Sequence, residues 1–385
     1  MSKLFTPGKL GPLELRNRTI RSAAFEGMCP EGRPSEALVA HHRAMAAGGV
    51  GMTTVAYAAV SPDGRTFAHQ MWMRPEIEDD LRRLTDAVHG EGGAAAIQMG
   101  HAGFMADRAV TGSAVLAPSR VINLYGLALP RAMTETDIED LVAAFGRATT
   151  LARDAGFDAV EVQAGHGYLI SQFLSPYTNR RKDRWGGNLE GRARLMGEVL
   201  RAVKAAAGPE LAVIMKMNLR DGFDGGLEVE EAVEIARLAE REGVDGLVLS
   251  GGFSNRTPFY IMRGDVPLDD LIQGERNLLK KVGMMLFGKM VVRTYPFTDA
   301  YFLDLAEKLV GQVDVPLILV GGLKSRAVID QVLDAGFDFV AMARALICEP
   351  DFVVRLAGVE PAVSRCEPCN RCVASMYHGE QRCPL

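Results

Sequence analysis

The sequence predicts an α/β protein that folds as a closed (β/α)₈ TIM barrel. Three observations predict it: eight short apolar runs of strand length, helical patterns between them, and four places where a helix-like segment closes on Gly before a strand. Such a Gly suits a left-handed helix C-cap. Eight βα units in a chain of this length favour a closed barrel, and the alternative is an open doubly wound sheet.

The expected strands are, in chain order, 19–23, 52–56, 94–98, 159–163, 211–217, 246–250, 316–320 and 339–342. The clearest helical patterns are 138–155, 192–206, 229–242 and 325–335. Helices between parallel strands provide the crossovers that a barrel requires. We expect the barrel to occupy residues 1–360 and a cysteine-rich tail, residues 361–385, to pack on it.

Two connections are longer than a barrel requires. Residues 104–133 follow the third strand and residues 253–298 follow the sixth, so both leave the strand ends where barrels build active sites. We expect lids or substrate walls, and the alternative is surface insertions without a role. Residues 271–287 look amphipathic and predict a short helix, packed over the barrel mouth or against a partner subunit.

Composition favours an enzyme with a small-molecule substrate. The chain has 385 residues, 48% of them apolar, which suffices for a large buried core. A net charge of −5 without a Lys/Arg-rich run argues against nucleic acid or an anionic membrane as the main partner. The first ten residues lack a leader pattern and no run of 18 apolar residues occurs, so we expect a cytoplasmic protein without membrane spans.

Two phosphate-type signals follow the last two expected strands. Gly321 and Gly322 come directly after a strand and before a helix, where backbone N–H groups can face an anion. Ala343 and Arg344 end the next strand and supply a guanidinium. Barrels commonly bind phosphate at these two loops, and the alternative is a tight turn beside an unrelated Arg.

Polar side chains also occur on three other expected strands. Lys216 is a cation in a near-continuous apolar run and therefore needs an anionic or strongly accepting partner, unless it snorkels to the surface. A cofactor that gains negative charge on reduction would be such a partner. Gln98 could offer an amide to a polar heterocycle. Gln163 and His166 could hold a substrate oxygen, and Tyr168 is a phenol that can donate a proton.

Four cysteines lie within the last 20 residues: Cys366, Cys369, Cys372 and Cys383. In a reducing compartment this crowding suggests metal or cluster ligation before disulfides. The other two, Cys29 and Cys348, are expected to be ordinary packing residues.

The polar stretch after the fourth expected strand carries a specific resemblance. It reads His166-Gly167-Tyr168-Leu169-Ile170, then 173–176, Asn179, Arg181, Asp183, 185–187 and Arg192. This stretch resembles the signature of the Old Yellow Enzyme family, also called the NADH:flavin oxidoreductase family. Residues 4–7 with 15–18, and 98–103, resemble further parts of the family, so the resemblance covers most of the chain. It implies an FMN-binding barrel that uses NAD(P)H to reduce a C=C bond conjugated to a carbonyl or similar group.

The resemblance also implies roles for single residues. Ala23 and Ala24 would offer backbone contacts to the flavin, Gln98 and Lys216 would bind its pyrimidine end, and Gly321, Gly322, Ala343 and Arg344 would hold the phosphate. Tyr168 would donate the proton, while Gln163 and His166 would grip the substrate carbonyl. Gln163 departs from the usual His, Phe25 stands where some members have Cys or Thr, Gly27 replaces a frequent Tyr, and Phe104 stands where a basic residue often occurs.

The cysteine tail is similar to the iron–sulfur motif of the dienoyl-CoA reductase and trimethylamine dehydrogenase branch, with a slightly shorter spacing to the fourth Cys. It implies a [4Fe–4S] cluster, and zinc or unligated thiols are the alternatives. The rival function is dehydrogenation of an amine or saturated carbonyl compound, with electrons passing through the cluster to a separate protein. An RNA-modifying FMN barrel and a non-catalytic scaffold are further alternatives. The sequence is compatible with a monomer and with a homo-oligomer.

Overall fold

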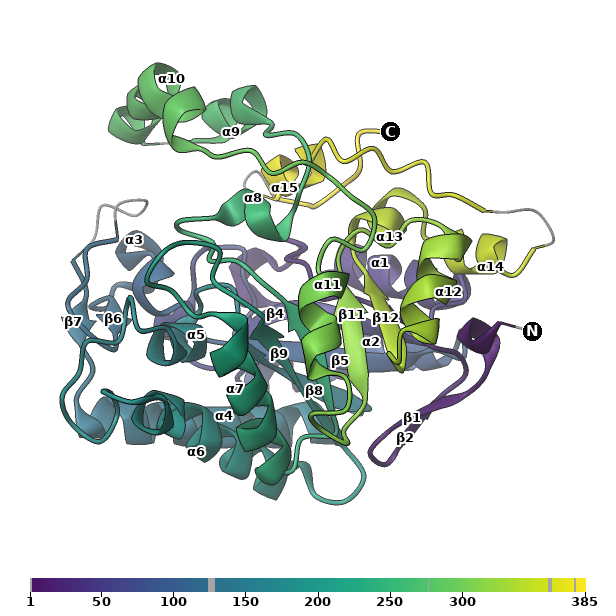
Figure 1. Ribbon diagram of the computed structural model, residues 1–385, viewed down its shortest axis with the longest axis horizontal. Coiled ribbons are helices and arrows are strands. Elements are labelled where there is room, and N and C mark those ends of the chain that lie inside the picture. The colour runs from purple at the N-terminus through teal and green to yellow at the C-terminus, as the bar shows by residue number, and fades with distance from the viewer. Residues whose placement is uncertain (1, 124–128, 276, 359–361, 377–378) are drawn as a thin grey trace.

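The fold is a closed barrel of eight parallel strands, seen in a computed structural model that describes residues 2–123, 129–275, 277–358, 362–376 and 379–385 (Figure 1). The strands are β3 (Thr19–Arg21), β4 (Met52–Ala59), β5 (Ala94–Gly100), β8 (Ala159–Ala164), β9 (Ala212–Asn218), β10 (Gly246–Ser250), β11 (Leu317–Val320) and β12 (Phe339–Met342). Pairing of β12 with β3 closes the barrel. The predicted fold class and all eight predicted strands are therefore confirmed.

The first predicted strand runs two residues too far. β3 ends at Arg21, because the chain then turns and the Arg21 guanidinium donates a hydrogen bond to the Ala24 carbonyl oxygen at 3.2 Å. This turn presents Ser22, Ala23 and Ala24 at the end of the barrel instead of continuing the sheet. The alternation of a sequence cannot reveal such a turn, since these residues are compatible with either conformation.

Helices surround the barrel: α1 (Glu36–Ala47), α2 (Glu78–His89), α4 (Glu135–Asp154), α6 (Leu189–Ala207), α7 (Val229–Arg241), α12 (Arg326–Asp334), α13 (Arg344–Cys348) and α14 (Phe352–Leu356). The four predicted helical patterns are confirmed to within three residues at each end. α4 begins with a capping box in which Thr134 and Asp137 satisfy each other's backbone N–H groups, as the sequence order Thr-x-x-Asp favours.

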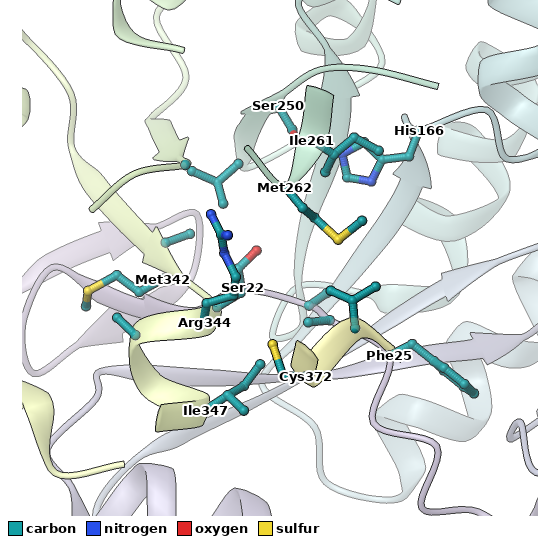
Figure 2. Close-up of a pocket in the computed structure, with 18 of the residues that line it drawn as sticks. Ser22, Phe25, His166, Ser250, Ile261, Met262, Met342, Arg344, Ile347 and Cys372 are labelled. Atoms are coloured by element: carbon teal, nitrogen blue, oxygen red, sulfur yellow. Dashed lines mark hydrogen bonds between the residues drawn. The ribbon is translucent and has the colours of Figure 1, made fainter. Parts of the chain in front are cut away.

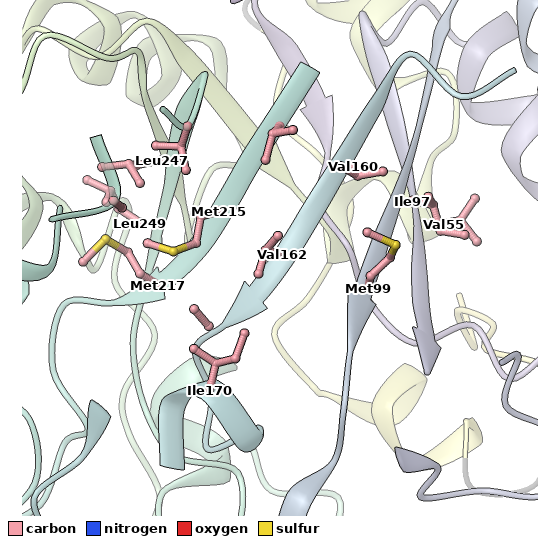
Figure 3. Packing of buried hydrophobic residues seen from close by; sticks show 14 of the residues in the cluster. Val55, Ile97, Met99, Val160, Val162, Ile170, Met215, Met217, Leu247 and Leu249 are labelled. Atoms are coloured by element: carbon pink, nitrogen blue, oxygen red, sulfur yellow. The ribbon is translucent and has the colours of Figure 1, made fainter. Parts of the chain in front are cut away.

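Strand alternation creates two apolar layers. Val160 and Val162 of β8 face outward and pack with Met215 and Leu247 against the helices, as Figure 3 shows. Residues of the other parity face the barrel interior, where a second cluster is closed at the N-terminal end by the hairpin of β1 (Gly8–Leu10) and β2 (Leu13–Leu15). Glu161 therefore points into the barrel between two outward valines.

The two long connections have secondary structure of their own. The first contains α3 (Arg108–Thr111) and the parallel pair β6 (Leu116–Ala117) and β7 (Arg131–Ala132). The second contains α8 (Pro258–Ile261), α9 (Leu268–Gly274) and α10 (Leu278–Val291), and α11 (Leu303–Ala306) follows it. The single helix expected at 271–287 is wrong in detail, because Glu275 has an extended backbone and divides the segment into α9 and α10.

The C-terminal tail lies across the end of the barrel where the strands terminate, with α15 (Arg371–Ser375) beside α9 (Figure 1). Three backbone contacts attach it: Val363 bridges Ser325, the Asp265 N–H donates to Pro368, and the Gln381 N–H donates to Glu26. Among the described residues, none of the helices combines the length and the apolar character needed to cross a bilayer.

Candidate active site

A cavity with about 1340 Å³ of space, part of it open to solvent, lies at the C-terminal ends of the strands. Its walls include every predicted catalytic and cofactor residue: Ala23, Ala24, Gln98, Gln163, His166, Tyr168, Lys216, Gly321, Gly322, Ala343 and Arg344. Figure 2 shows Arg344 and His166 on opposite sides of the cavity, with Cys372 of the tail on the Arg344 side. Residues far apart in sequence thus meet in one site.

The second long connection forms part of the cavity wall, as predicted, through Ile261, Met262 and Phe297. The first long connection contributes none of the described lining residues, so its expected role as a substrate wall has no support in the described part of the cavity. Residues 124–128 of that connection lie outside the described residues.

Lys216 has an anionic partner within the chain. Its ammonium lies 2.8 Å from the Glu161 carboxylate, and both side chains are 1% exposed. Gln98 donates a hydrogen bond of 2.5 Å to the same carboxylate, and Lys216 donates one of 3.3 Å to Ser22. Because burying a lone charge is costly, this pairing explains how a Lys can occupy an apolar strand. An anionic or strongly accepting partner was predicted from the sequence, with a reduced cofactor as one example, but Glu161 was not identified.

Adjacent strand positions explain this network. Gln98 pairs with Glu161 across β5 and β8, while Gln163 pairs with Lys216 across β8 and β9. Neighbouring side chains on one face of a sheet lie within interaction distance. The alternation of β8 places Glu161 and Gln163 on the same inward face, which is the sequence signal that could have identified Glu161.

His166 is a neutral imidazole in a polar network. Burial first, and then the nearby Lys216 charge, lower its pKa to about 3. Its Nε2 lies 2.7 Å from Ser250 Oγ, and its Nδ1 lies 3.5 Å from the Gln163 amide nitrogen. The backbone at His166 is left-handed, with φ 59°, and its N–H donates to Asn218. At neutral pH this ring can donate or accept a hydrogen bond but carries no charge.

Tyr168 stands at the start of α5 (Leu169–Leu174), next to a second phenol that the sequence argument missed. Its ring meets the Tyr57 ring edge-on, with centroids 4.9 Å apart. Burial raises the pKa of Tyr57 to about 12, although hydrogen bonds to Thr66, Gln70 and Tyr168 oppose the shift. Tyr57 extends the apolar run of β4, so a longer strand prediction there would have placed a phenol at the barrel end.

The Gly pair after β11 forms a cradle that other residues could not form. Gly321 and Gly322 have φ of 111° and 75°, in the region that favours glycine. A Cβ on Gly322 would lie 2.6 Å from the Ala300 nitrogen. The two backbone segments can therefore approach this closely only because residue 322 has no Cβ. Ser325 then caps α12 by accepting from Val328, and Lys324 and Arg344 add cationic side chains to the same wall. This donor set suits an anion.

The turn after β3 rests on a buried ion pair. Arg21 and Glu26 lie 2.7 Å apart with side chains 0% and 2% exposed, and the Glu26 carboxylate accepts from the Ala56 N–H. Burial lowers the pKa of His41 to about 3 and that of His42 far below its usual range. Ligand atoms of Glu26, His41 and His42 lie within 4.8 Å of one another, but the Arg21 guanidinium already supplies the cation.

Asn370 fastens the tail to the cavity wall. Its amide donates to the carbonyl oxygens of Met262 at 2.6 Å and Asp265 at 2.9 Å, and its oxygen accepts from Arg344 at 2.7 Å. Its left-handed φ of 56° is one that Asn tolerates better than most residues. Asn370 was not predicted as part of the site, because only the tertiary structure brings it to Arg344.

Two of the four tail cysteines, Cys366 and Cys372, line the cavity. Burial raises the pKa of Cys366 to about 11 and that of Cys372 to about 12, against the effect of Arg344. Burial first, and then the neighbouring Cys383 thiol, raise the pKa of Cys348 to about 12.

Comparison with known proteins agrees with the fold and the motif. The sequence model of the NADH:flavin oxidoreductase / NADH oxidase family matches residues 3–250. The 4,4'-dithiodibutanoate disulfide reductase of Rhodococcus erythropolis is 41% identical over 377 residues, which are 98% of this chain and 93% of that protein.

Two solved structures have the same fold. Morphinone reductase matches with a TM-score of 0.75 and 25% identity over 98% of this chain and 93% of its own. A 2-naphthoyl-CoA reductase in complex with 2-naphthoyl-CoA matches with a TM-score of 0.85 and 23% identity over 99% of this chain, which spans 56% of that longer one. The chain belongs to the NADH:flavin oxidoreductase / NADH oxidase family, as the Old Yellow Enzyme signature in its sequence predicted.

Proposed function

We propose that this flavin oxidoreductase binds FMN and uses NAD(P)H to reduce a C=C bond conjugated to a carbonyl or similar group. The observation that carries the proposal is the convergence of Tyr168, His166 and Gln163 on the cavity that also contains Lys216 and the Gly321–Gly322 cradle. A proton donor, neutral hydrogen-bonding groups and an anion site are thereby combined in one space.

The residues present fit FMN. Gly321, Gly322, Ala343 and Arg344 would hold the phosphate, since the cradle leaves no room for a Cβ and cations line the same wall. Ala23 and Ala24 would offer backbone groups, and Gln98 with Lys216 would bind the pyrimidine end of the flavin. When bound, FMN supplies hydride transfer from the nicotinamide to the acceptor.

The protein's own residues would orient the acceptor and supply a proton. His166 and Gln163 can hydrogen-bond a carbonyl oxygen, because a neutral imidazole and an amide both carry N–H donors. Tyr168 would donate its phenolic proton to the carbon next to the carbonyl and recover a proton from solvent. The overall reaction consumes one NAD(P)H and one proton for each C=C bond reduced.

Anaerobic assays test this function directly. The purified holoenzyme should be yellow, should be bleached by NADH or NADPH, and should regain its colour with an enone while the saturated ketone forms. Bleaching without any turnover of a panel of enones would contradict the proposed acceptor class. A preparation that binds no flavin would contradict the proposed cofactor.

Reduction of an organic disulfide is a second candidate, favoured by the 41% identity to a reductase named for a disulfide acid. One NAD(P)H and one proton would convert the disulfide to two thiols. Thiols are acidic enough to leave as thiolates, so this reaction needs no phenolic proton donor. Turnover of 4,4'-dithiodibutanoate but of no enone would select this candidate.

The tail would hold a [4Fe–4S] cluster through Cys366, Cys369, Cys372 and Cys383. The CxxCxxC spacing supports this assignment, as does the position of two of these thiols at the cavity wall. Such a cluster would also serve the rival dehydrogenase, which would pass electrons to a separate protein. Iron and acid-labile sulfide should be present at about four atoms each per chain, and a protein prepared anaerobically without iron would contradict the assignment.

A further inference from the structure

The helix α10 has a broad apolar face that lies open. Leu278, Val282, Met285, Leu286 and Met290 recur at helical spacing and therefore share one side of the helix. Their exposed fractions are 73, 45, 60, 69 and 79%, and Phe287 beside them is 53% exposed. Single exposed apolar side chains are common, but five large ones on one side of a helix mark a surface that binds something.

The rest of α10 is attached to the molecule through α9. Gly288 is buried, and its missing Cβ would lie 2.8 Å from the Leu268 side chain, so the two helices approach closely there. α9 in turn contacts α15, and Asp270 forms an ion pair of 2.8 Å with Arg371 of the tail. Figure 1 shows α10 as the outer helix of this hairpin, beyond the end of the barrel. The apolar face thus belongs to an anchored element.

The charge of this segment opposes that of the whole chain. Residues 277–293 contain four basic residues and no acidic one, for a net charge of +4. Because the chain carries −5, the remaining residues together carry −9. The whole-chain charge that argued against an anionic membrane therefore conceals a basic and apolar segment. Basic side chains beside exposed apolar ones give this segment two properties that an anionic bilayer surface attracts.

A second copy of the chain fits this surface less well. Pairing two α10 faces across a two-fold axis would bring two segments of charge +4 together, and like charges at an interface oppose association. An anionic lipid surface instead matches both properties, since the headgroups attract the cations and the acyl boundary takes up the apolar side chains.

The hairpin also lies next to the entrance of the active site. Met262, which lines the cavity, precedes α9 in the chain, and Phe297, which lines it too, follows α10. A helix resting on a lipid surface would therefore bring the rim of the cavity close to that surface.

We propose that α10 docks the protein on the surface of an anionic lipid bilayer, with the helix in the interface and the barrel outside it. Docking of this kind needs no spanning helix, which agrees with the described part of the chain. It does not depend on which acceptor the active site reduces.

Vesicle co-sedimentation of the flavin-loaded enzyme tests the proposal. The wild type should sediment with phosphatidylglycerol-containing vesicles, much less with pure phosphatidylcholine, and progressively less as salt rises. The double variant Leu286→Glu/Met290→Glu should lower the lipid partition coefficient by at least about tenfold, because it removes apolar contacts and adds negative charge. Val354→Glu is the matched control, since Val354 is 55% exposed on α14, away from the hairpin, and should leave binding unchanged.

Three results would overturn the proposal: no sedimentation of the wild type with anionic vesicles, equal binding by the double variant, or an equal loss in Val354→Glu. Analytical ultracentrifugation of the same proteins without lipid tests whether a second copy of the chain occupies this face instead. A wild-type dimer that the double variant converts to monomers would assign the face to a second copy and would also overturn it. Flavin content and enone or disulfide turnover, measured in parallel, report separately on the proposed function.

Discussion

The Lys216 ammonium, which lines the cavity, lies 2.8 Å from the Glu161 carboxylate, and both side chains are buried. Gln98 donates to the same carboxylate. The charge that Lys216 would offer to a bound flavin is therefore partly balanced by the protein itself. Glu161 becomes a positioning residue for two of the proposed flavin-binding side chains, since one carboxylate holds both of them.

Glu161→Gln should destabilise the protein and make the bound flavin easier to reduce. Removing one partner of a buried ion pair leaves an uncompensated charge and typically costs about 3 kcal/mol. The freed Lys216 charge should shift the flavin midpoint potential to more positive values. Denaturant unfolding and a redox titration measure the two effects. Glu230→Gln is the control, because its pair with Lys308 is exposed and should matter little. An unchanged potential would separate Glu161 from the flavin site.

Tyr168→Phe should slow enone reduction by about 10²-fold or more, because general acid catalysis contributes that much. Flavin reduction by NAD(P)H should stay nearly intact, since this half-reaction needs no phenol. Stopped-flow absorbance resolves the two half-reactions. Tyr177→Phe offers a matched phenol outside the cavity lining. Equal losses in both half-reactions would refute the proton-donor role, and full disulfide turnover in the variant would support the second candidate function.

Gly322→Ala should abolish stable flavin binding. Its added Cβ would lie 2.6 Å from the Ala300 nitrogen in a left-handed backbone, so the cradle must move. The control is Gly112→Ala, which has a similar φ of 69° and no atom within 4 Å of the added Cβ. It should lower stability by only about 1–2 kcal/mol and leave flavin bound. Flavin fluorescence after gel filtration reports the retained cofactor, and full retention in Gly322→Ala would contradict the phosphate site.

Asn370→Ala should loosen the tail. The substitution removes three hydrogen bonds, to Met262, Asp265 and Arg344, and places Ala in a left-handed backbone. At about 1 kcal/mol for each hydrogen bond, local opening should become on the order of 100-fold more frequent. Hydrogen exchange of residues 365–375 measures this opening. Asp270→Asn breaks only the exposed pair with Arg371 and should change exchange little.

Acid should destabilise the protein through His42. This side chain is fully buried, and its pKa in the folded state lies well below 6.5, so only the unfolded state takes up its proton as the pH falls below about 6.5. Its stabilising effect is thus complete above that pH and is lost at up to about 1.4 kcal/mol per pH unit below it. Denaturant unfolding between roughly pH 8 and pH 5 covers the window that the pKa shift defines. Over this window the free energy of unfolding should fall less steeply with decreasing pH in His42→Gln than in the wild type. The exposed His89→Gln is the control.

The sequence by itself determined the barrel and most of the site. Apolar runs of strand length and the Gly that closes a helix in four places are local signals, and a parallel barrel places the C-terminal ends of all its strands on one face. The barrel, together with the family resemblance, predicted that Gln98, Lys216, Tyr168 and Gly322 lie at one site. The order of strands alone brings such residues together.

Only the tertiary structure decided which side chains meet within that cavity. Glu161 became the partner of Lys216 through the register of β8 against its neighbours, and Asn370 reached Arg344 across 26 positions of sequence. The division into α9 and α10, and the exposure of the α10 apolar face, likewise depend on packing between distant segments. Hydrophobic periodicity indicates which face of a helix or strand is apolar. Whether that face is buried depends on whether another part of the chain packs against it.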